Sequence, residues 1–173
     1  MKIKSVWILY ILRALLIIST LLVLAFIFSN AVATGEDSSK QSTEITVKVQ
    51  EVVAVIAPNS PIATASGEDF DVLHSFVRTL AHFAEYALLG ACSFGTFLSF
   101  MQKGRWRYAF FTPAFLALTA AVDEFAQSLT AGRAAQFADF TVDCLGSVCG
   151  MAVALLVYGL VVLILNKKKG ECL

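Results

Sequence analysis

The sequence predicts an all-α integral membrane protein. We expect four transmembrane helices, both termini in the cytoplasm, and an amphipathic extracytoplasmic helix before the second span. Hydrophobic residues make up 58% of the 173 residues and charged residues only 15%, whereas soluble domains contain about 45–50% apolar and about 25% charged residues. Four stretches are also long enough to cross about 30 Å of hydrocarbon, which takes about 20 residues. These stretches are approximately 6–28, 81–100, 108–125 and 140–165.

The positive charges predict the orientation of these spans. Nine of the 13 Lys and Arg residues flank the spans on one side, and the positive-inside rule places that side in the cytoplasm. They are Lys2, Lys4, Arg13, Lys103, Arg105, Arg107, Lys167, Lys168 and Lys169. The other side holds Lys40, Lys48, Arg78 and Arg133. We therefore expect a single membrane domain over residues 1–173 with cytoplasmic amino and carboxyl termini. The formal net charge of zero gives no indication of a nucleic-acid partner.

The first span also has an alternative interpretation, as a cleaved signal peptide. Lys2, Lys4, the apolar run and the small residues at 31–33 all fit such a signal. The apolar run at 6–28 is longer than the about 7–15 residues usual in a signal peptide, which favours a retained transmembrane helix. In that case Arg13 extends toward the cytoplasmic surface.

An extracytoplasmic loop of about residues 30–80 joins the first two spans. Residues 34–44 are polar, and we expect a flexible segment there. Residues 45–57 could form an interfacial helix or a strand, and their periodicity does not distinguish the two. Residues 68–80 place apolar side chains at helical intervals. This spacing predicts an amphipathic helix that lies at the outer interface and continues into the second span.

Three of the predicted spans carry polar side chains at one depth, near the outer membrane boundary. Residues three or four apart share one face of a helix, and this spacing recurs in the second, third and fourth spans. The residues are His82, Glu85 and Tyr86, then Asp123, Glu124 and Gln127, then Asp139 and Asp143. Ionisable groups cost about 2.5–3.5 kcal/mol or more at the centre of a span, so those retained usually face the protein interior. We therefore expect one polar cluster.

The acids of this cluster outnumber the nearby basic residues. Five carboxylates accompany only two arginines, Arg78 and Arg133. Some acids are therefore expected to be protonated, or a cation joins them. Arg133 could pair with a carboxylate and hold the third and fourth helices together, the candidates being Asp123, Glu124 and Asp139. Alternatively, Arg133 could bind an anionic ligand.

Glycines continue the polar stripe along the fourth span. Gly146 and Gly150 follow Asp143 on the same helix face, and their four-residue spacing predicts close packing against another helix. The cysteines show no disulfide pattern. Cys92, Cys144 and Cys149 lie within apolar spans, which is typical of small buried hydrophobic residues.

Together these residues resemble the VanZ-like membrane protein family. The resemblance covers residue 6 to about 165, except 31–70. It rests on "FSN" (28–30), "HFAEYALLG" (82–90), "DEFAQ" (123–127), "GR" (132–133), Asp139, Asp143, Gly146 and Gly150. The chain departs from the family at two positions. The family often has Arg-Lys where this chain has Arg78 followed by Thr79, and commonly has asparagine at the position of Asp143.

The resemblance implies a bacterial envelope protein connected with low-level resistance to teicoplanin, a glycopeptide antibiotic that acts on cell-wall precursors outside the membrane. We expect an outer-leaflet polar pocket, among membrane lipids, that binds a lipid-linked cell-wall precursor or the antibiotic. The ligand-binding residues would belong to the polar cluster with Arg78 and Arg133. No sequence resembles a nucleotide-binding loop, so we expect no nucleotide partner.

Two other functions fit the same residues. A membrane enzyme acting on an envelope lipid could use His82 or Glu85 as an acid or base. Alternatively, His82, Glu85 and Asp123 could hold a divalent cation, and we expect no other cofactor. The sequence shows no established nucleophile or metal signature, so it does not decide whether the protein is an enzyme. Ion-coupled transport by an oligomer is the third interpretation.

Overall fold

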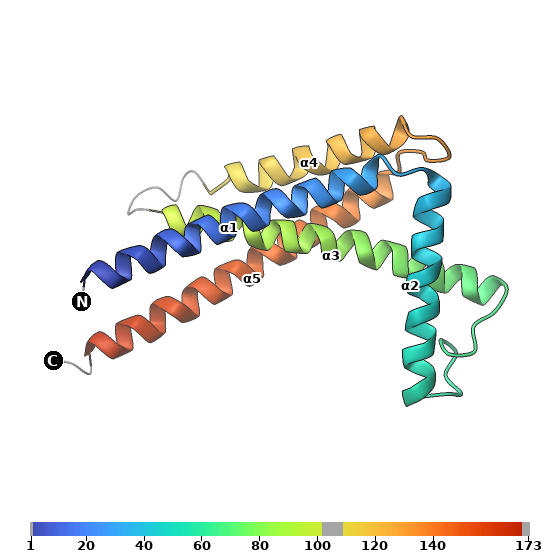
Figure 1. Ribbon diagram of the computed structural model, residues 1–173, viewed down its shortest axis with the longest axis horizontal. Helices are drawn as coiled ribbons and strands as arrows, with labels where there is room; N and C mark the ends of the chain where they lie inside the picture. Colours follow the sequence, from blue (N-terminus) through green and yellow to red (C-terminus); the bar gives the residue numbers. More distant parts are fainter. Residues whose placement is uncertain (1, 102–108, 171–173) are drawn as a thin grey trace.

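The computed structural model describes the backbone of residues 2–101 and 109–170 and the side chains of residues 7–101 and 109–167. These ranges contain five helices and no strand, which confirms the predicted all-α fold class. The helices are α1 (Lys2–Ala31), α2 (Gly35–Ile56), α3 (Glu68–Phe100), α4 (Phe111–Ser128) and α5 (Phe137–Gly170). Helices α1, α3, α4 and α5 form a bundle. Helix α2 lies across one end of it, and both termini lie at the other end (Figure 1).

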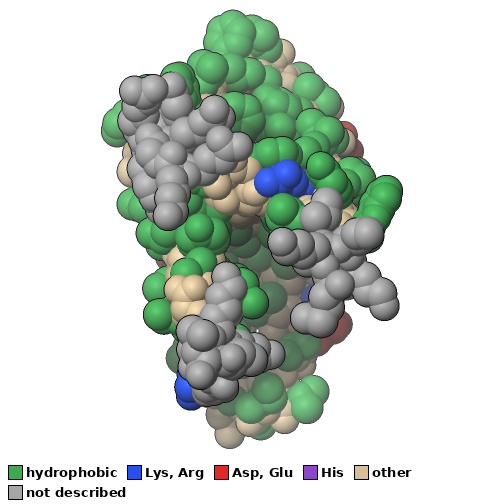
Figure 2. All heavy atoms as spheres, turned by 90° about the vertical axis from the view of Figure 1, so that its left-hand side faces the viewer, with side chains coloured by type: hydrophobic (Ala, Val, Ile, Leu, Met, Phe, Trp, Pro, Cys, Tyr) green, Lys and Arg blue, Asp and Glu red, His purple; other side chains and the backbone are tan. Residues whose placement is uncertain are grey.

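Within the described residues, three helices are long and apolar enough to cross a membrane. They correspond to Trp7–Ala31, Glu68–Phe100 and Phe137–Lys167. Many of their apolar side chains are exposed, as expected for side chains that contact lipid, and hydrophobic side chains cover most of the described surface at the end that carries the termini (Figure 2). Three of the four predicted spans thus coincide with helices that are long and apolar enough to cross a membrane. The remaining one corresponds to α4, whose 18 residues include two acids and a glutamine, so composition alone does not identify it as a span.

Helix α2 begins within the segment 34–44, where the sequence predicts a flexible loop, so that prediction is wrong. At 45–57, where the sequence allows either a helix or a strand, the structure has a helix. Thr34 caps its first turn, because the Thr34 hydroxyl accepts a hydrogen bond from the Asp37 backbone N–H at 3.2 Å and donates one to the Asp37 carboxylate at 2.7 Å. Acidic side chains in this turn also favour the helix through its dipole. The Gly35 N–H donates to the carbonyl of Ala131 at 3.0 Å. This bond ties the start of α2 to the loop between α4 and α5.

Helix α3 runs without a break from residue 68 to 100, as predicted for the lead-in and the second span. At about 1.5 Å per residue it measures about 50 Å, which exceeds the about 30 Å of hydrocarbon. At its end, Arg13 of α1 donates from Nε and Nη2 to the carbonyl of Ser99, at 3.1 and 2.8 Å, and lies over the Phe100 ring. Arg13 therefore contacts the carboxyl end of α3, where the helix dipole favours a positive charge.

The closest helix pairing is between α3 and α5. An added Cβ at Gly146 would collide with the carbonyl of Phe83, and one at Gly150 would collide with the carbonyl of Ala87. Because Gly146 and Gly150 have no side chain beyond a hydrogen atom, the backbones of α3 and α5 can approach each other closely. The same pairing brings Asp143, one turn earlier on α5, against the polar face of α3.

An apolar core joins α1, α3, α4 and α5 beneath α2. Its buried members are Ile27, Tyr86, Leu89, Leu116 and Ala120. Tyr86 also donates from its hydroxyl to Asp123 of α4, so the core adjoins polar residues of the same helices.

Candidate functional site

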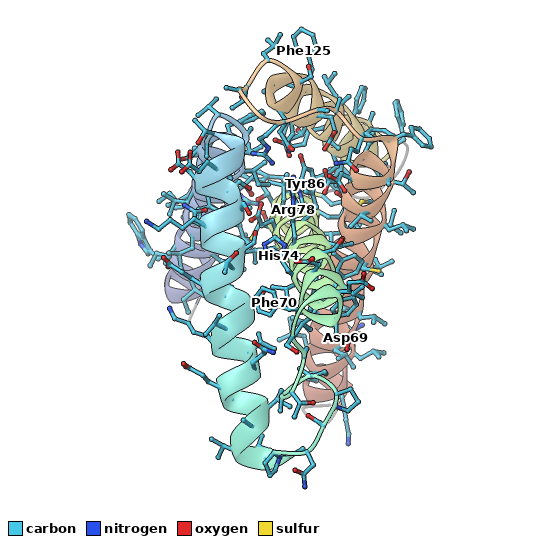
Figure 3. All side chains as sticks on the ribbon, turned by 90° about the vertical axis from the view of Figure 1, so that its right-hand side faces the viewer. Asp69, Phe70, His74, Arg78, Tyr86 and Phe125 are labelled. Carbon is cyan, nitrogen blue, oxygen red and sulfur yellow. The ribbon has the colours of Figure 1, made fainter. Side chains whose placement is uncertain are left out.

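A cavity of about 350 Å³ lies between α2 and the adjacent parts of α1, α3 and α4. Figure 3 looks at this end of the molecule, with Arg78 and Tyr86 of α3 in the space between α2, α4 and α5, and Phe125 on the outer side of α4. Apolar and polar groups both line the cavity. Its titratable lining residues are Glu44, Lys48, Arg78, His82, Glu85, Asp123 and Arg133. The cavity therefore gathers several members of the predicted cluster in one place.

Helix α2 supplies a wall of this cavity that the sequence interpretation missed. Its lining residues include Ser38, Gln41, Ser42, Ile45 and Lys48. They recur every three or four residues and so share one helix face. This spacing is visible in the sequence and indicates a helix, but the polar composition of residues 34–44 favours a flexible segment instead.

Arg133 anchors the loop between α4 and α5. Its Nη1 donates to the carbonyl of Asn30 at 2.8 Å, and its Nη2 donates to Oε1 of Gln127 at 2.6 Å. Its buried Nε has no hydrogen-bond partner in the described part of the chain. Arg133 therefore does not form the expected ion pair with a carboxylate among the described residues. The guanidinium instead connects the ends of α1 and α4 through a carbonyl and an amide.

Positive charges lie together at the cavity. Burial lowers the pKa of the Arg133 guanidinium from its usual value, and the nearby charge of Arg78 acts in the same direction. Among the described side chains, Arg78 and Lys48 form neither a hydrogen bond nor an ion pair. Three cationic side chains thus line one cavity, two without a partner and the third with a free N–H.

A second group of polar side chains lies at the inner side of the cavity. Tyr86 donates from its hydroxyl to Oδ2 of Asp123 at 3.0 Å. His82 Nδ1 lies 3.6 Å from Oδ1 of Asp143, which is longer than a hydrogen bond. Asp123 is 2% exposed and Asp143 is fully buried. Ligand atoms of His82, Asp123 and Asp143 lie within 4.8 Å of one another, so these three residues could hold a metal ion.

Glu85 lies outside this group of candidate metal ligands. Its Oε1 accepts a hydrogen bond from Nδ2 of Asn30 at 3.2 Å, which connects α3 to the end of α1. Asp143 thus takes the position that the sequence interpretation assigned to Glu85 in the candidate metal set. The reason is geometric, because the close approach of α5 to α3 depends on tertiary packing and places Asp143 beside His82.

Glu124 and Asp139 do not line the cavity. The Oε2 atom of Glu124 accepts a hydrogen bond from the backbone N–H of Gln136 at 2.7 Å, just before α5 begins. Asp139 lies in the first turn of α5, where the helix dipole favours a carboxylate. The structure therefore places both at the start of α5.

Comparison with protein families identifies one match. The family model described as VanZ/LLP1 matches residues 16–158, a range that includes every residue of the predicted polar cluster. Comparisons with curated proteins and with solved structures found no match. The family match thus extends from α1 into α5 and covers most of the chain.

Proposed function

The chain belongs to the VanZ/LLP1 family of helical membrane proteins, and from this premise we propose that its cavity binds the anionic headgroup of a lipid-linked envelope component. The observation that carries the proposal is the pair of unpartnered cations, Lys48 and Arg78, beside the free Nε of Arg133. Cations gathered in one cavity attract a phosphate or carboxylate, to which arginine donates charge-assisted hydrogen bonds.

The remaining lining suits the rest of such a ligand. Glu44 and Glu85 offer acceptors for hydroxyl or amino groups of a headgroup. Phe26, Ile27 and Ile45 provide an apolar part where a lipid chain can begin. The volume of about 350 Å³ is that of a headgroup site and not of a whole lipid. The acyl or prenyl chain would therefore lie outside the cavity, in the bilayer.

The proposal includes an orientation in a bacterial membrane. The termini lie at one end of the bundle and the cavity at the other (Figure 1). We assign the end that carries the termini to the cytoplasm, because positively charged residues flank the spans there. In this orientation α4 crosses the membrane beside α1 and α5 as a fourth span, and its acids face inward, away from lipid.

Reporter fusions test this orientation. Green fluorescent protein fused after Leu173 is expected to fluoresce, and alkaline phosphatase at the same position is expected to be inactive, because that enzyme folds only outside the cytoplasm. Alkaline phosphatase inserted after Asn59, which is exposed between α2 and α3, is expected to be active. The opposite pattern of activities would place the cavity on the cytoplasmic side and contradict the proposal.

Arg78→Gln is expected to weaken binding of a polyprenyl phosphate about 10- to 100-fold, since charge-assisted hydrogen bonds contribute about 1.5–3 kcal/mol. Native mass spectrometry of the detergent-solubilised protein measures the affinity, with the phosphate-free polyprenol as the matched probe. Because Arg78 forms no hydrogen bond or ion pair among the described side chains, the thermal unfolding temperature of the variant should not fall.

Lys40→Gln is the matched control, because Lys40 carries the same charge on α2 but lies outside the cavity. In a host that the wild-type protein protects from teicoplanin, Arg78→Gln is expected to abolish protection at unchanged surface expression, whereas Lys40→Gln retains it. Equal binding of the phosphate and the alcohol, or full protection by a well-expressed Arg78→Gln protein, would refute the proposed function.

A further inference from the structure

We propose that His82, Asp123 and Asp143 bind a divalent transition-metal ion, with Zn²⁺ as the first candidate. The three residues come from α3, α4 and α5, and their ligand atoms lie within 4.8 Å of one another. Metal coordination at about 2.0–2.2 Å from each atom requires only a small closure of this group. The inference does not depend on the proposed lipid ligand.

The unpartnered atoms of this group distinguish it from a cluster of acids that only lie near one another. Both carboxylate oxygens of the fully buried Asp143 lack a hydrogen-bond partner among the described residues. The same holds for Oδ1 of Asp123 and Nδ1 of His82. Buried polar atoms normally have partners, because leaving them unpaired is costly. A cation coordinated by one of these atoms from each residue would satisfy all three side chains together.

The composition of the group indicates the kind of ion. Imidazole nitrogen favours zinc and neighbouring transition metals, whereas calcium and magnesium prefer oxygen ligands alone. A protonated His82 would balance only one of the two aspartates, whereas a divalent ion balances both. Three protein ligands leave a fourth tetrahedral position open. His82 and Asp123 also line the cavity, which therefore gives access to this group.

Tyr86 is the positioning residue of this site. Its hydroxyl donates to Oδ2 of Asp123 at 3.0 Å, which leaves Oδ1 without a hydrogen-bond partner among the described residues and available to an ion. Hydrogen bonds of this type orient metal ligands, and their loss typically weakens metal binding about 10- to 100-fold. The hydroxyl of Tyr86 therefore affects the ion through Asp123 and without direct contact.

Zinc titration of the purified full-length protein in detergent tests the inference. After treatment with a chelator, the wild-type protein is expected to bind one Zn²⁺ per chain, measured by inductively coupled plasma mass spectrometry, and to unfold at a higher temperature when zinc is present. Asp143→Asn, which keeps the shape of the side chain, should lose both effects. Tyr86→Phe should retain the stoichiometry with an affinity reduced about 10- to 100-fold.

Asp139→Asn is the matched control, since Asp139 lies one turn earlier on α5 and outside the metal group. It should bind zinc like the wild type. X-ray absorption at the zinc edge of the wild-type protein gives a measurement that does not depend on any variant, with nitrogen and oxygen ligands and no sulfur expected. Less than stoichiometric zinc in the wild type, sulfur ligation, or unchanged binding by Asp143→Asn would each overturn the inference.

Discussion

Gly150→Ala is expected to lower the free energy of unfolding by about 2–4 kcal/mol, because overpacking between helices is costly when backbone atoms must move. An added Cβ would collide with the carbonyl of Ala87 and lie 2.8 Å from the backbone nitrogen of Ala91. Neither main-chain atom can rotate away, so α5 must move away from α3. Thermal unfolding in detergent, followed by circular dichroism, measures the effect.

Gly159→Ala is the control for this prediction. Gly159 lies on the same helix, and no atom of the described residues lies within 4 Å of a Cβ added there. Alanine has the higher helix propensity, by about 1 kcal/mol in water, so this change is expected to be neutral or stabilising. Equal unfolding temperatures for the two variants would show that close packing at Gly150 does not limit stability.

The sequence predicts the helices of the bundle well because their signals are local. The apolar lengths indicate three of the spans, and the intervals at 68–80 indicate the extension of α3. The prediction for α2 at 34–44 was wrong for a physical reason. Its polar composition resembles a loop, whereas its helical form depends on the Thr34 cap and on the attachment of Gly35 to Ala131. The contact with Ala131 lies far along the chain and leaves no local pattern.

In the candidate site, too, the sequence predicts what depends on local spacing but not what depends on how the helices pack. The spacing of His82 and Glu85 predicts a shared helix face, and both residues line the cavity. The partners of individual side chains depend on which helix ends meet. Arg133 contacts the carbonyl of Asn30 because the last carbonyls of α1 have no partner within their own helix. Counting charges, which favoured a carboxylate partner, does not reveal such a backbone acceptor.

Arg133→Met is expected to destabilise the protein by about 2 kcal/mol, because each buried acceptor left without a donor costs about 1–3 kcal/mol. The variant removes the donor to Oε1 of Gln127, which is 2% exposed, whereas the carbonyl of Asn30 loses Arg133 but still accepts from the Ala33 N–H at 3.2 Å. Relief of the repulsion between Arg133 and Arg78 offsets part of this loss. Thermal unfolding in detergent measures the effect, and Arg78→Gln, which removes no hydrogen bond among the described residues and relieves the same repulsion, should not lower stability.

A double-mutant cycle separates the hydrogen bond between Arg133 and Gln127 from the other contacts of Arg133. Gln127→Met alone leaves Nη2 of Arg133 unpaired, whereas the double variant replaces both partners by apolar side chains, an exchange that is often nearly neutral. We therefore expect the double variant to be more stable than the sum of the single effects by about 0.5–3 kcal/mol. Strictly additive losses would mean that this hydrogen bond does not hold the loop. Arg133 would then stabilise the end of the bundle through Asn30 alone, and its guanidinium would be freer to bind an anion than the structure indicates.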